Sequence, residues 1–314
     1  MRENVLFVLN REYDCIIIGA GAAGLFCAAH LAPARVLVLE KMNLPGRKLL
    51  ITGSSQCNIT HAGNMKNFTK HYGDHGAFLQ YALMAFPNTS TQNYFERRGI
   101  RFVEKDSGKM FPESLSADDI LDALLDACDD AGTKISNSTP AKMVSFENGK
   151  YAVKTLNDTY YAKVLVLATG GKSYPQTGST GDGFVFAEAL GHSIAKQHPS
   201  LAPIYVTDHR LADLSGISIP GVVISIWRGG KRQITNSGDL LITRFGYSGP
   251  IILNTARWMR AGDQIRITFS PKKVEELDVL IRTACLASGT KQIQNLLSDT
   301  GCPNRLIRQM IKEA

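Results

Sequence analysis

The order of apolar runs near the start of the chain predicts a strand, a helix and a second strand. Residues 13–18 form a short run rich in isoleucine, which is typical of a strand inside a parallel sheet. An alanine-rich run with helical spacing follows at 25–31, and a second apolar run at 36–39 ends at Glu40. This order predicts the first βαβ unit of an α/β fold.

Three glycines at G-x-G-x-x-G spacing, Gly19, Gly21 and Gly24, join the first strand to the helix. Gly19 permits a tight turn, Gly21 lets the backbone approach a pyrophosphate, and Gly24 lets helix and strand pack closely. The helix start offers unpaired N–H groups to phosphate oxygens. Glu40 lies about 20 residues on, where an acid accepts ribose hydroxyls and repels a 2′-phosphate. The sequence therefore predicts a dinucleotide site that disfavours NADP.

The apolar pattern of residues 75–132 predicts helices and short strands. Residues 75–99 have helical spacing, and short strands are expected at 102–103 and 110–111. An amphipathic helix is predicted from Ser116, a suitable N-cap, to Gly132, a suitable helix end.

A β-meander is predicted over residues 141–168. Asn148-Gly149 is a strong hairpin signal between two alternating runs, and residues 163–168 suit a buried strand that follows a short one at 160–162. That strand ends in Thr169-Gly170-Gly171, where glycine lets the backbone pass close to a neighbouring group. A helix is expected at 184–190.

The second half of the chain changes character at about residue 204. Short strands are expected at 222–227, 232–235, 240–243 and 264–269, with a helix ending at Met259, and residues 271–314 are expected to be helical. We therefore predict three parts: a cofactor-binding domain at 1–203, a β-rich insert at 204–270 and a helical segment at 271–314.

Composition narrows the function classes. The 314 residues carry a formal net charge of +7 without a long basic run or a recognisable nucleic-acid module, so we do not expect nucleic-acid binding. No apolar run approaches the roughly 20 residues of a membrane helix. The six cysteines are scattered without C-x-x-C spacing or a metal-like cluster, which indicates a reduced cytoplasmic protein with no metal site.

Two further segments give the chain a family resemblance. Residues 46–60 read Gly-Arg-Lys-Leu-Leu-Ile-Thr-Gly-Ser-Ser-Gln-Cys-Asn-Ile-Thr, and residues 172–183 read Lys-Ser-Tyr-Pro-Gln-Thr-Gly-Ser-Thr-Gly-Asp-Gly. Together with the glycine turn and Ala168-Thr169-Gly170-Gly171, they resemble the FAD-dependent oxidoreductases often labelled aminoacetone-oxidase-like or 3-dehydro-bile-acid-reductase-like. The chain departs from that family at Gln56, where the usual residue is arginine.

The resemblance implies a glutathione-reductase-type, Rossmann-like FAD domain with an inserted β-rich domain and a small helical region. It also implies that loop 172–183 lies near the flavin and the substrate entrance, and that the insert at 204–270 caps the flavin and helps form the substrate pocket. Family members usually continue into Gly-Leu-Tyr-Phe-Ala-Gly-Glu-like and Gly-Gly-Tyr-Asn-like motifs, which this chain does not carry. We expect FAD as cofactor, with NAD(P)H as a transient electron donor or oxygen as the oxidant.

The predicted cofactor-binding residues combine the motifs with their neighbours. They are Gly19, Ala20, Gly21, Ala22, Ala23, Gly24, Glu40, Lys41, Arg47, Lys48, Cys57, Asn58, Met143, Ala168, Thr169, Gly170 and Gly171.

Several roles stay open at this stage. Arg47 and Lys48 either neutralise phosphate or are ordinary exposed charges. Cys57 has no partner at disulfide-reductase spacing, so it either lines the flavin or packs in the core. Tyr174 either donates a proton or stacks on a ring, or it is structural. The sequence assigns no catalytic residue.

The main functional hypothesis is an FAD-dependent oxidoreductase that transfers hydride through the flavin to or from a small organic molecule. Two alternatives remain. The chain binds flavin without being a complete catalyst, or its substrate is RNA, as in flavin-dependent RNA-modifying enzymes. The sequence identifies neither the substrate nor the oligomeric state.

Overall fold

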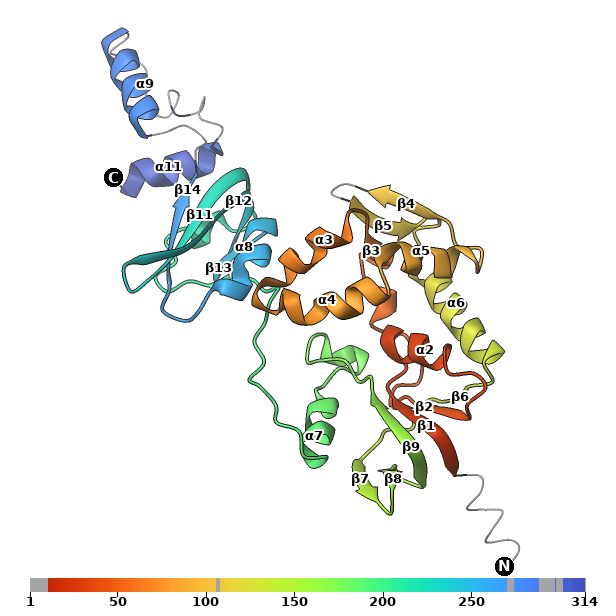
Figure 1. Cartoon of the computed structure of the whole chain (residues 1–314). Helices are drawn as coiled ribbons and strands as arrows, with labels where there is room; N and C mark the ends of the chain where they lie inside the picture. Colours follow the sequence, from red (N-terminus) through yellow and green to blue (C-terminus); the bar gives the residue numbers. More distant parts are fainter. Residues whose placement is uncertain (1–10, 106–107, 270–273, 288–296, 298–301, 314) are drawn as a thin grey trace, which may run out of the picture. The chain divides into compact units, whose positions relative to one another are not determined.

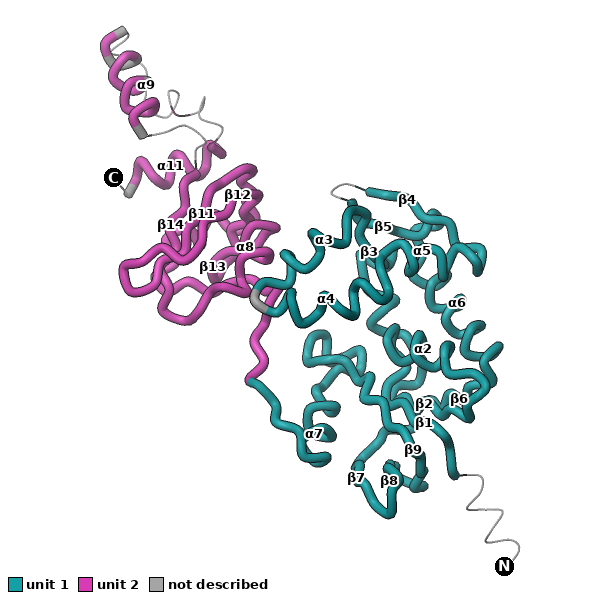
Figure 2. The backbone as a smooth tube through the Cα atoms, viewed as in Figure 1, with its two compact units in different colours: residues 1–195 teal, residues 196–314 magenta. Residues whose placement is uncertain are grey.

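The computed structural model describes residues 11–105, 108–269, 274–287, 297 and 302–313. The chain divides into two compact units, residues 1–195 and residues 196–314 (Figure 2). The predicted three-part division at residues 203 and 270 stays a prediction.

A six-stranded sheet forms the centre of unit 1, in the order β6-β2-β1-β9-β8-β7 (Figure 1). Four neighbouring strands run parallel: β6 (Lys134–Ser136), β2 (Val36–Leu39), β1 (Glu12–Ile18) and β9 (Thr159–Leu167). The sheet continues with two antiparallel strands, β8 (Lys150–Lys154) and β7 (Met143–Glu147). The α/β fold, its first two strands and the β-meander are therefore confirmed.

The two faces of this sheet are buried against different elements. Ile17 faces a core that also contains residues of α2 (Ala22–Ala28) and α6 (Ala117–Asp130). Ile16 faces the opposite core, with residues of the meander and Phe186 of α7 (Asp182–Ala189). Successive side chains of a strand point to opposite faces, so a strand covered on both sides must be apolar throughout. This explains the uninterrupted isoleucine run.

The amphipathic helix α6 has the predicted ends. Ser116 is its N-cap, and the Ser116 hydroxyl accepts a hydrogen bond from the backbone N–H of Asp118 at 3.2 Å. Gly132 follows the helix in the left-handed region, with φ of +68°. A short edge strand, β6, comes directly afterwards. The sequence does not reveal this strand, because three residues are too few to establish a period.

A three-stranded sheet and several short helices complete unit 1. The sheet has the order β3-β5-β4, and the strands are β3 (Thr60–His61), β4 (Phe102–Lys105) and β5 (Lys109–Pro112). The helices are η1 (Leu49–Ile51), α3 (Met65–Phe68), η2 (Thr69–His75), α4 (Gly76–Ala85), α5 (Asn88–Glu96) and η4 (Pro175–Thr177).

The helical expectation for residues 75–99 is confirmed, and the helical residues fall in two helices. The structure has α4 and α5, separated at Phe86 and Pro87. Proline lacks the N–H that a continuing helix needs, and it disfavours helical geometry in the residue before it. Phe86 accordingly has φ of −134° and ψ of 81°.

The meander differs from expectation in one respect. Residues 160–162 and 163–168 were expected to lie in separate strands, but β9 is a single strand. Its second half is less buried than predicted, because Val164 is 51% exposed. The hairpin turn is as predicted, since Asn148 and Gly149 both have positive φ, as a type I′ turn requires.

Unit 2 is built on a five-stranded antiparallel sheet in the order β10-β13-β12-β11-β14. Its strands are β10 (Ile204–Tyr205), β11 (Ser218–Arg228), β12 (Lys231–Thr243), β13 (Gly246–Ser248) and β14 (Gln264–Thr268). Its helices are η5 (Ala212–Leu214), α8 (Pro250–Thr255), η6 (Ala256–Trp258), α9 (Val274–Ala287) and α11 (Asn304–Glu313). The core contains Ile224, Ile226, Leu240, Ile242 and Leu306.

Two expectations for unit 2 need comment. Strands at 232–235 and 240–243 were expected to be separate, but β12 runs through both, because Asn236 and Gly238 pair with residues of β11 despite their turn-forming character. The helical expectation for 271–314 is confirmed for α9 and α11, and residues 288–296 and 298–301 lie outside the described residues. Among the described helices, none is long and apolar enough to cross a membrane.

Candidate functional site

The candidate site is a cavity of about 520 Å³ where the parallel strands of unit 1 end. Ile18, Leu39 and Leu167, the last residues of β1, β2 and β9, all line it. Ligands of open α/β sheets bind in this position, beyond the carboxyl ends of the strands. The cavity is therefore the natural candidate for a cofactor site.

Twelve of the predicted cofactor residues line this cavity. They are Gly19, Ala20, Gly21, Ala22, Ala23, Glu40, Lys41, Arg47, Lys48, Ala168, Thr169 and Gly170. Thus the fold brings together three sequence segments that are more than 100 residues apart at their extremes.

The glycine turn has a different steric constraint at each glycine. A Cβ on Gly24 would lie 2.0 Å from the carbonyl oxygen of Gly19, so only glycine fits there. Gly19 has φ of +107°, and a Cβ on it would lie 2.6 Å from the carbonyl oxygen of Ala168. A Cβ on Gly21 would meet nothing within 4 Å. Gly21 therefore leaves open space on the cavity side, whereas Gly19 and Gly24 permit close packing.

Glu40 fastens the glycine turn to the end of β2. One oxygen of its carboxylate accepts a hydrogen bond from the backbone N–H of Ala20 at 2.8 Å, and the other accepts one from Met42 at 2.8 Å. Glu40 is 9% exposed. Each carboxylate oxygen has a second lone pair, so both can still accept a hydrogen bond from a ligand hydroxyl.

The second turn, Ala168–Gly171, is fixed to the first turn of α7. The Thr169 hydroxyl accepts a hydrogen bond from the backbone N–H of Gly183 at 3.1 Å. A Cβ on Gly183 would lie 2.2 Å from that hydroxyl, so glycine is required there. Gly170 has φ of +73°, which favours glycine. The two turns also contact one another through Gly19 and Ala168.

A charged cluster closes one side of the cavity. The Lys41 ammonium donates to the Thr180 hydroxyl at 2.6 Å and to the Asp182 carboxylate at 2.7 Å. The Thr180 hydroxyl also donates to Asp182, at 2.7 Å. Burial raises the pKa of Asp182, but the hydrogen bonds from Lys41 and Thr180 and the charge of Lys41 outweigh it, so the pKa lies below its ordinary value. This cluster joins the residue after Glu40 to the start of α7.

Arg47 and Lys48 supply positive charge to the same cavity. Both residues are half-buried and line the cavity. They are therefore not ordinary exposed charges, which was the alternative left open by the sequence. Burial lowers the pKa of Lys48. An anionic group in the cavity would compensate for that burial, because an opposite charge favours the charged form of lysine.

Five predicted residues do not line the cavity. Gly24 packs against Gly19, and Gly171 lies one residue beyond the lining part of its turn. Met143 is 53% exposed on β7, and Asn58 is exposed. Cys57 is 2% exposed in the unit 1 core, and burial raises the pKa of its thiol, although a hydrogen bond with Thr52 opposes this. Their cofactor roles stay predictions.

The sequence did not single out several lining residues. They include Leu44, Leu49, Thr52, Ala141, Thr177, Ser179, Asp182 and Phe186. The sequence did carry a signal for three of them, because Thr177, Ser179 and Asp182 belong to the 172–183 segment that carries the family resemblance. Tyr174 of that segment is 59% exposed and does not line the cavity. Among the described residues, no cluster of His, Cys, Asp or Glu suits a metal ion.

Comparison with known protein families assigns the chain to one of them. The family model described as HI0933-like protein Rossmann domain matches residues 13–296. The chain belongs to this family. The HI0933-like match covers both units and begins with the strand that leads into the glycine turn.

Three curated proteins illustrate the relationship of this HI0933-like chain to others. It is 31% identical over 314 residues to the ribosomal RNA dihydrouridine synthase of Haemophilus influenzae, and the match covers 97% of this chain and 75% of that protein. It is 28% identical to the Escherichia coli protein of the same name, over 95% of this chain and 73% of that protein. It is 26% identical to 3-dehydro-bile acid delta(4,6)-reductase of Clostridium scindens, over 82% of this chain and 64% of that protein.

Solved structures resemble the chain more distantly. The open conformation of a flavocytochrome c3 fumarate reductase is 15% identical, with a TM-score of 0.47, over 70% of this chain and 50% of that one. A likeness of this size carries no argument about function.

Proposed function

We propose that the HI0933-like chain binds FAD in the cavity beside the glycine turn and acts as an FAD-dependent oxidoreductase. The proposal rests on one observation: the Glu40 carboxylate lines the same cavity as Gly21, and the space beside the Gly21 Cα is unfilled. An acid at this place suits a ribose diol, and the open glycine suits close approach of a pyrophosphate.

The remaining lining residues fit the other parts of FAD by their chemistry. Arg47 and Lys48 would face the anionic pyrophosphate, and Thr169 and Gly170 would lie beside the cofactor further along. Lys41 and Asp182 would hold the start of α7 near the ribose end. When bound, FAD would supply the hydride chemistry, and the protein would supply binding, orientation and exclusion of water.

The names of the relatives suggest the reaction class. A dihydrouridine synthase adds two hydrogens to a uridine, and a delta(4,6)-reductase of a 3-dehydro compound reduces carbon–carbon double bonds near a ketone. Both names describe reduction of a double bond in a ring that also bears a carbonyl. We therefore propose that this chain transfers hydride through FAD to such a double bond in a small organic molecule, with NAD(P)H as the donor.

A second candidate substrate is RNA. Two relatives whose matches cover 97% and 95% of this chain are named for a reaction of ribosomal RNA, which supports this candidate. The same hydride chemistry would serve a uracil ring, because its double bond is also conjugated with a carbonyl.

The reaction is tested with the FAD-loaded chain under anaerobic conditions. NADH or NADPH should bleach the flavin absorbance bands, and 2-cyclohexen-1-one should restore them, whereas the saturated ketone cyclohexanone should not. For the second candidate, a uridine-containing RNA oligonucleotide replaces the enone, and the same oligonucleotide with dihydrouridine is the control. Recovery only with oxygen would contradict a reductase and indicate an oxidase.

A further inference from the structure

Both tryptophans of the chain, Trp227 and Trp258, lie in a stretch of unit 2 that is rich in cations. Residues 227–266 contain seven Lys and Arg against two Asp, which is a net charge of +5 out of +7 for the whole chain. Most of these residues lie on three segments, 227–232, 257–263 and 264–266. We call them together the tryptophan–arginine surface. This surface does not line the cavity of unit 1, and the function proposed above gives it no role.

Hydrogen bonds join the three segments. Arg228, at the end of β11, donates to both carboxylate oxygens of Asp263 at 2.7 Å and to the carbonyl oxygen of Trp258 at 3.0 Å. The backbone N–H of Arg260 donates to the same carboxylate at 2.8 Å. The Asp263 side chain is 4% exposed. Asp263 is the one acid in these three segments, and its carboxylate is bonded by Arg228 and Arg260 of the same surface. Its role is therefore to hold the segments together.

Two further arginines, Arg232 and Arg266, lie beside Trp227. In the antiparallel register, Trp227 of β11 is opposite Arg232 of β12, and Ser225 is opposite Arg266 of β14. Ser225 and Trp227 are two residues apart, so they lie on one face of the sheet. The Trp227 indole N–H donates to the Ser225 hydroxyl at 3.1 Å, and the Arg266 guanidinium lies 4.1 Å from the centre of the indole ring.

This face of the sheet is the outer one. Ile224 and Ile226, which alternate with Ser225 and Trp227, are 0% exposed and belong to the unit 2 core. Arg232 and Arg266 are exposed, and Lys231 is exposed at the hairpin turn. Within the described residues, none of these three cations forms an ion pair with an acid. The second tryptophan, Trp258, is 38% exposed.

We propose that the tryptophan–arginine surface binds single-stranded RNA. Arginine and lysine without acidic partners neutralise phosphates, and aromatic rings offer stacking platforms to unpaired bases. An acidic protein partner would be attracted by the positive charge, but its binding would not require two tryptophans beside that charge. The inference rests on the RNA candidate of the proposed function, but it concerns binding alone and requires no flavin chemistry.

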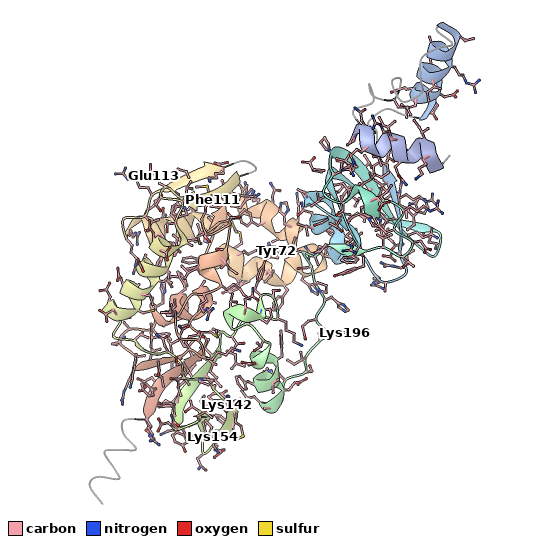
Figure 3. All side chains as sticks on the ribbon, turned by 180° about the vertical axis from the view of Figure 1, so that it is seen from behind. Tyr72, Phe111, Glu113, Lys142, Lys154 and Lys196 are labelled. Atoms are coloured by element: carbon pink, nitrogen blue, oxygen red, sulfur yellow. The ribbon has the colours of Figure 1, made fainter. Side chains whose placement is uncertain are left out.

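The test compares two double substitutions that remove equal charge. R232Q/R266Q changes the surface, and K154Q/K196Q removes two exposed lysines elsewhere (Figure 3). Binding of a fluorescein-labelled, uridine-rich 20-nucleotide RNA is followed by fluorescence anisotropy between 50 and 200 mM NaCl. R232Q/R266Q should weaken binding at least about tenfold and lower the slope of log K against log salt by about 1.4, because each phosphate contact contributes about 0.7. K154Q/K196Q should leave that slope within about 0.3 of the starting value.

Further controls keep the outcome unambiguous. A W258L variant, which removes the aromatic ring and keeps all charges, should weaken RNA binding without changing the salt slope, because stacking is not ionic. Circular dichroism identifies any variant that fails to fold. If a double variant fails to fold, W258L still tests the surface. Equal losses in the two double variants, no binding by the starting protein at 50 mM NaCl, or tighter binding of polyglutamate or single-stranded DNA than of RNA would overturn the proposal. None of these results depends on bound FAD or on turnover.

Discussion

The Glu40 carboxylate accepts a hydrogen bond from the backbone N–H of Ala20 at 2.8 Å, and it thereby ties the end of β2 to the glycine turn that follows β1. The same carboxylate accepts a second bond from Met42. Glu40 thus shapes the wall of the cavity whether or not a ribose is present. A ligand hydroxyl would add to this arrangement rather than replace it.

Replacing Glu40 should therefore affect folding as well as cofactor binding. In E40Q the amide NH₂ would face a backbone N–H in place of an acceptor oxygen. Leaving a buried donor unsatisfied costs about 1–3 kcal/mol, so E40Q should lower the free energy of unfolding by that amount. Urea denaturation of the cofactor-free chain measures it. The exposed Glu113 gives the matched control, and E113Q should change stability by less than about 0.5 kcal/mol (Figure 3). Equal stability of E40Q and the starting protein would show that these two hydrogen bonds are not structural.

Two alanine substitutions in the glycine turn should have different effects, one on stability and one on FAD binding. G24A places a Cβ 2.0 Å from the Gly19 carbonyl oxygen, so it should destabilise the cofactor-free chain by about 3 kcal/mol or more. G21A places a Cβ in open space, so it should leave the thermal midpoint of the cofactor-free chain nearly unchanged. It should nevertheless weaken FAD binding, because the methyl group occupies the approach of the pyrophosphate. Calorimetry of the cofactor-free chain and FAD titration separate the two effects, and a destabilised G21A would contradict the open space seen at that residue.

The Lys41–Asp182 pair should give a characteristic pH dependence. The pKa of Asp182 is lower in the folded chain than in an unfolded one, so its stabilising effect is present above the ordinary aspartate pKa of about 3.9. The effect is lost as the pH falls through the lowered folded value. D182N should therefore destabilise the chain at pH 7, and the difference in denaturation midpoint between D182N and the starting protein should shrink between pH 5 and pH 3. A constant difference over that range would rule out the ion pair as its source.

Two serines in the loop before Cys57 should be replaceable with a gain in stability. Ser54 and Ser55 have φ of +58° and +66°, a region that favours glycine over residues with a Cβ. S54G and S55G should each stabilise the chain by about 0.5–1 kcal/mol. Ser173 does not have positive φ, so S173G is the control and should be neutral or slightly destabilising. Chemical denaturation gives the comparison, and destabilisation by both loop variants would show that the loop does not keep this backbone geometry in solution.

Local patterns predict much of unit 1. The isoleucine run, the glycine spacing and Glu40 are close in sequence, and each leaves a signature that a single βαβ unit explains. The Ser116 cap and the Asn148-Gly149 hairpin likewise depend on neighbouring residues only. The family resemblance added the second turn at Thr169, which lies far from the first in sequence and beside it in the fold.

Features that depend on long-range pairing were missed. The short strand β6 acquires its role only beside β2, and β12 continues through Asn236 and Gly238 only because β11 supplies partners. The Lys41–Asp182 pair joins residues 141 positions apart.

From the sequence we did not expect nucleic-acid binding, in part because the chain carries no long basic run. The tryptophan–arginine surface instead assembles from separate segments, and our further inference departs from that expectation. The predicted cytoplasmic location and the absence of a metal stay predictions.

The most direct test of this account is an FAD titration of the purified chain beside G21A. Flavin absorbance is recorded after unbound FAD is removed by gel filtration. The account predicts a yellow protein with about one FAD per chain, and a G21A variant that keeps its fold but loses most of the flavin. A chain that stays colourless, or a G21A variant that retains FAD as fully as the starting protein, would contradict the assignment of the cavity to FAD.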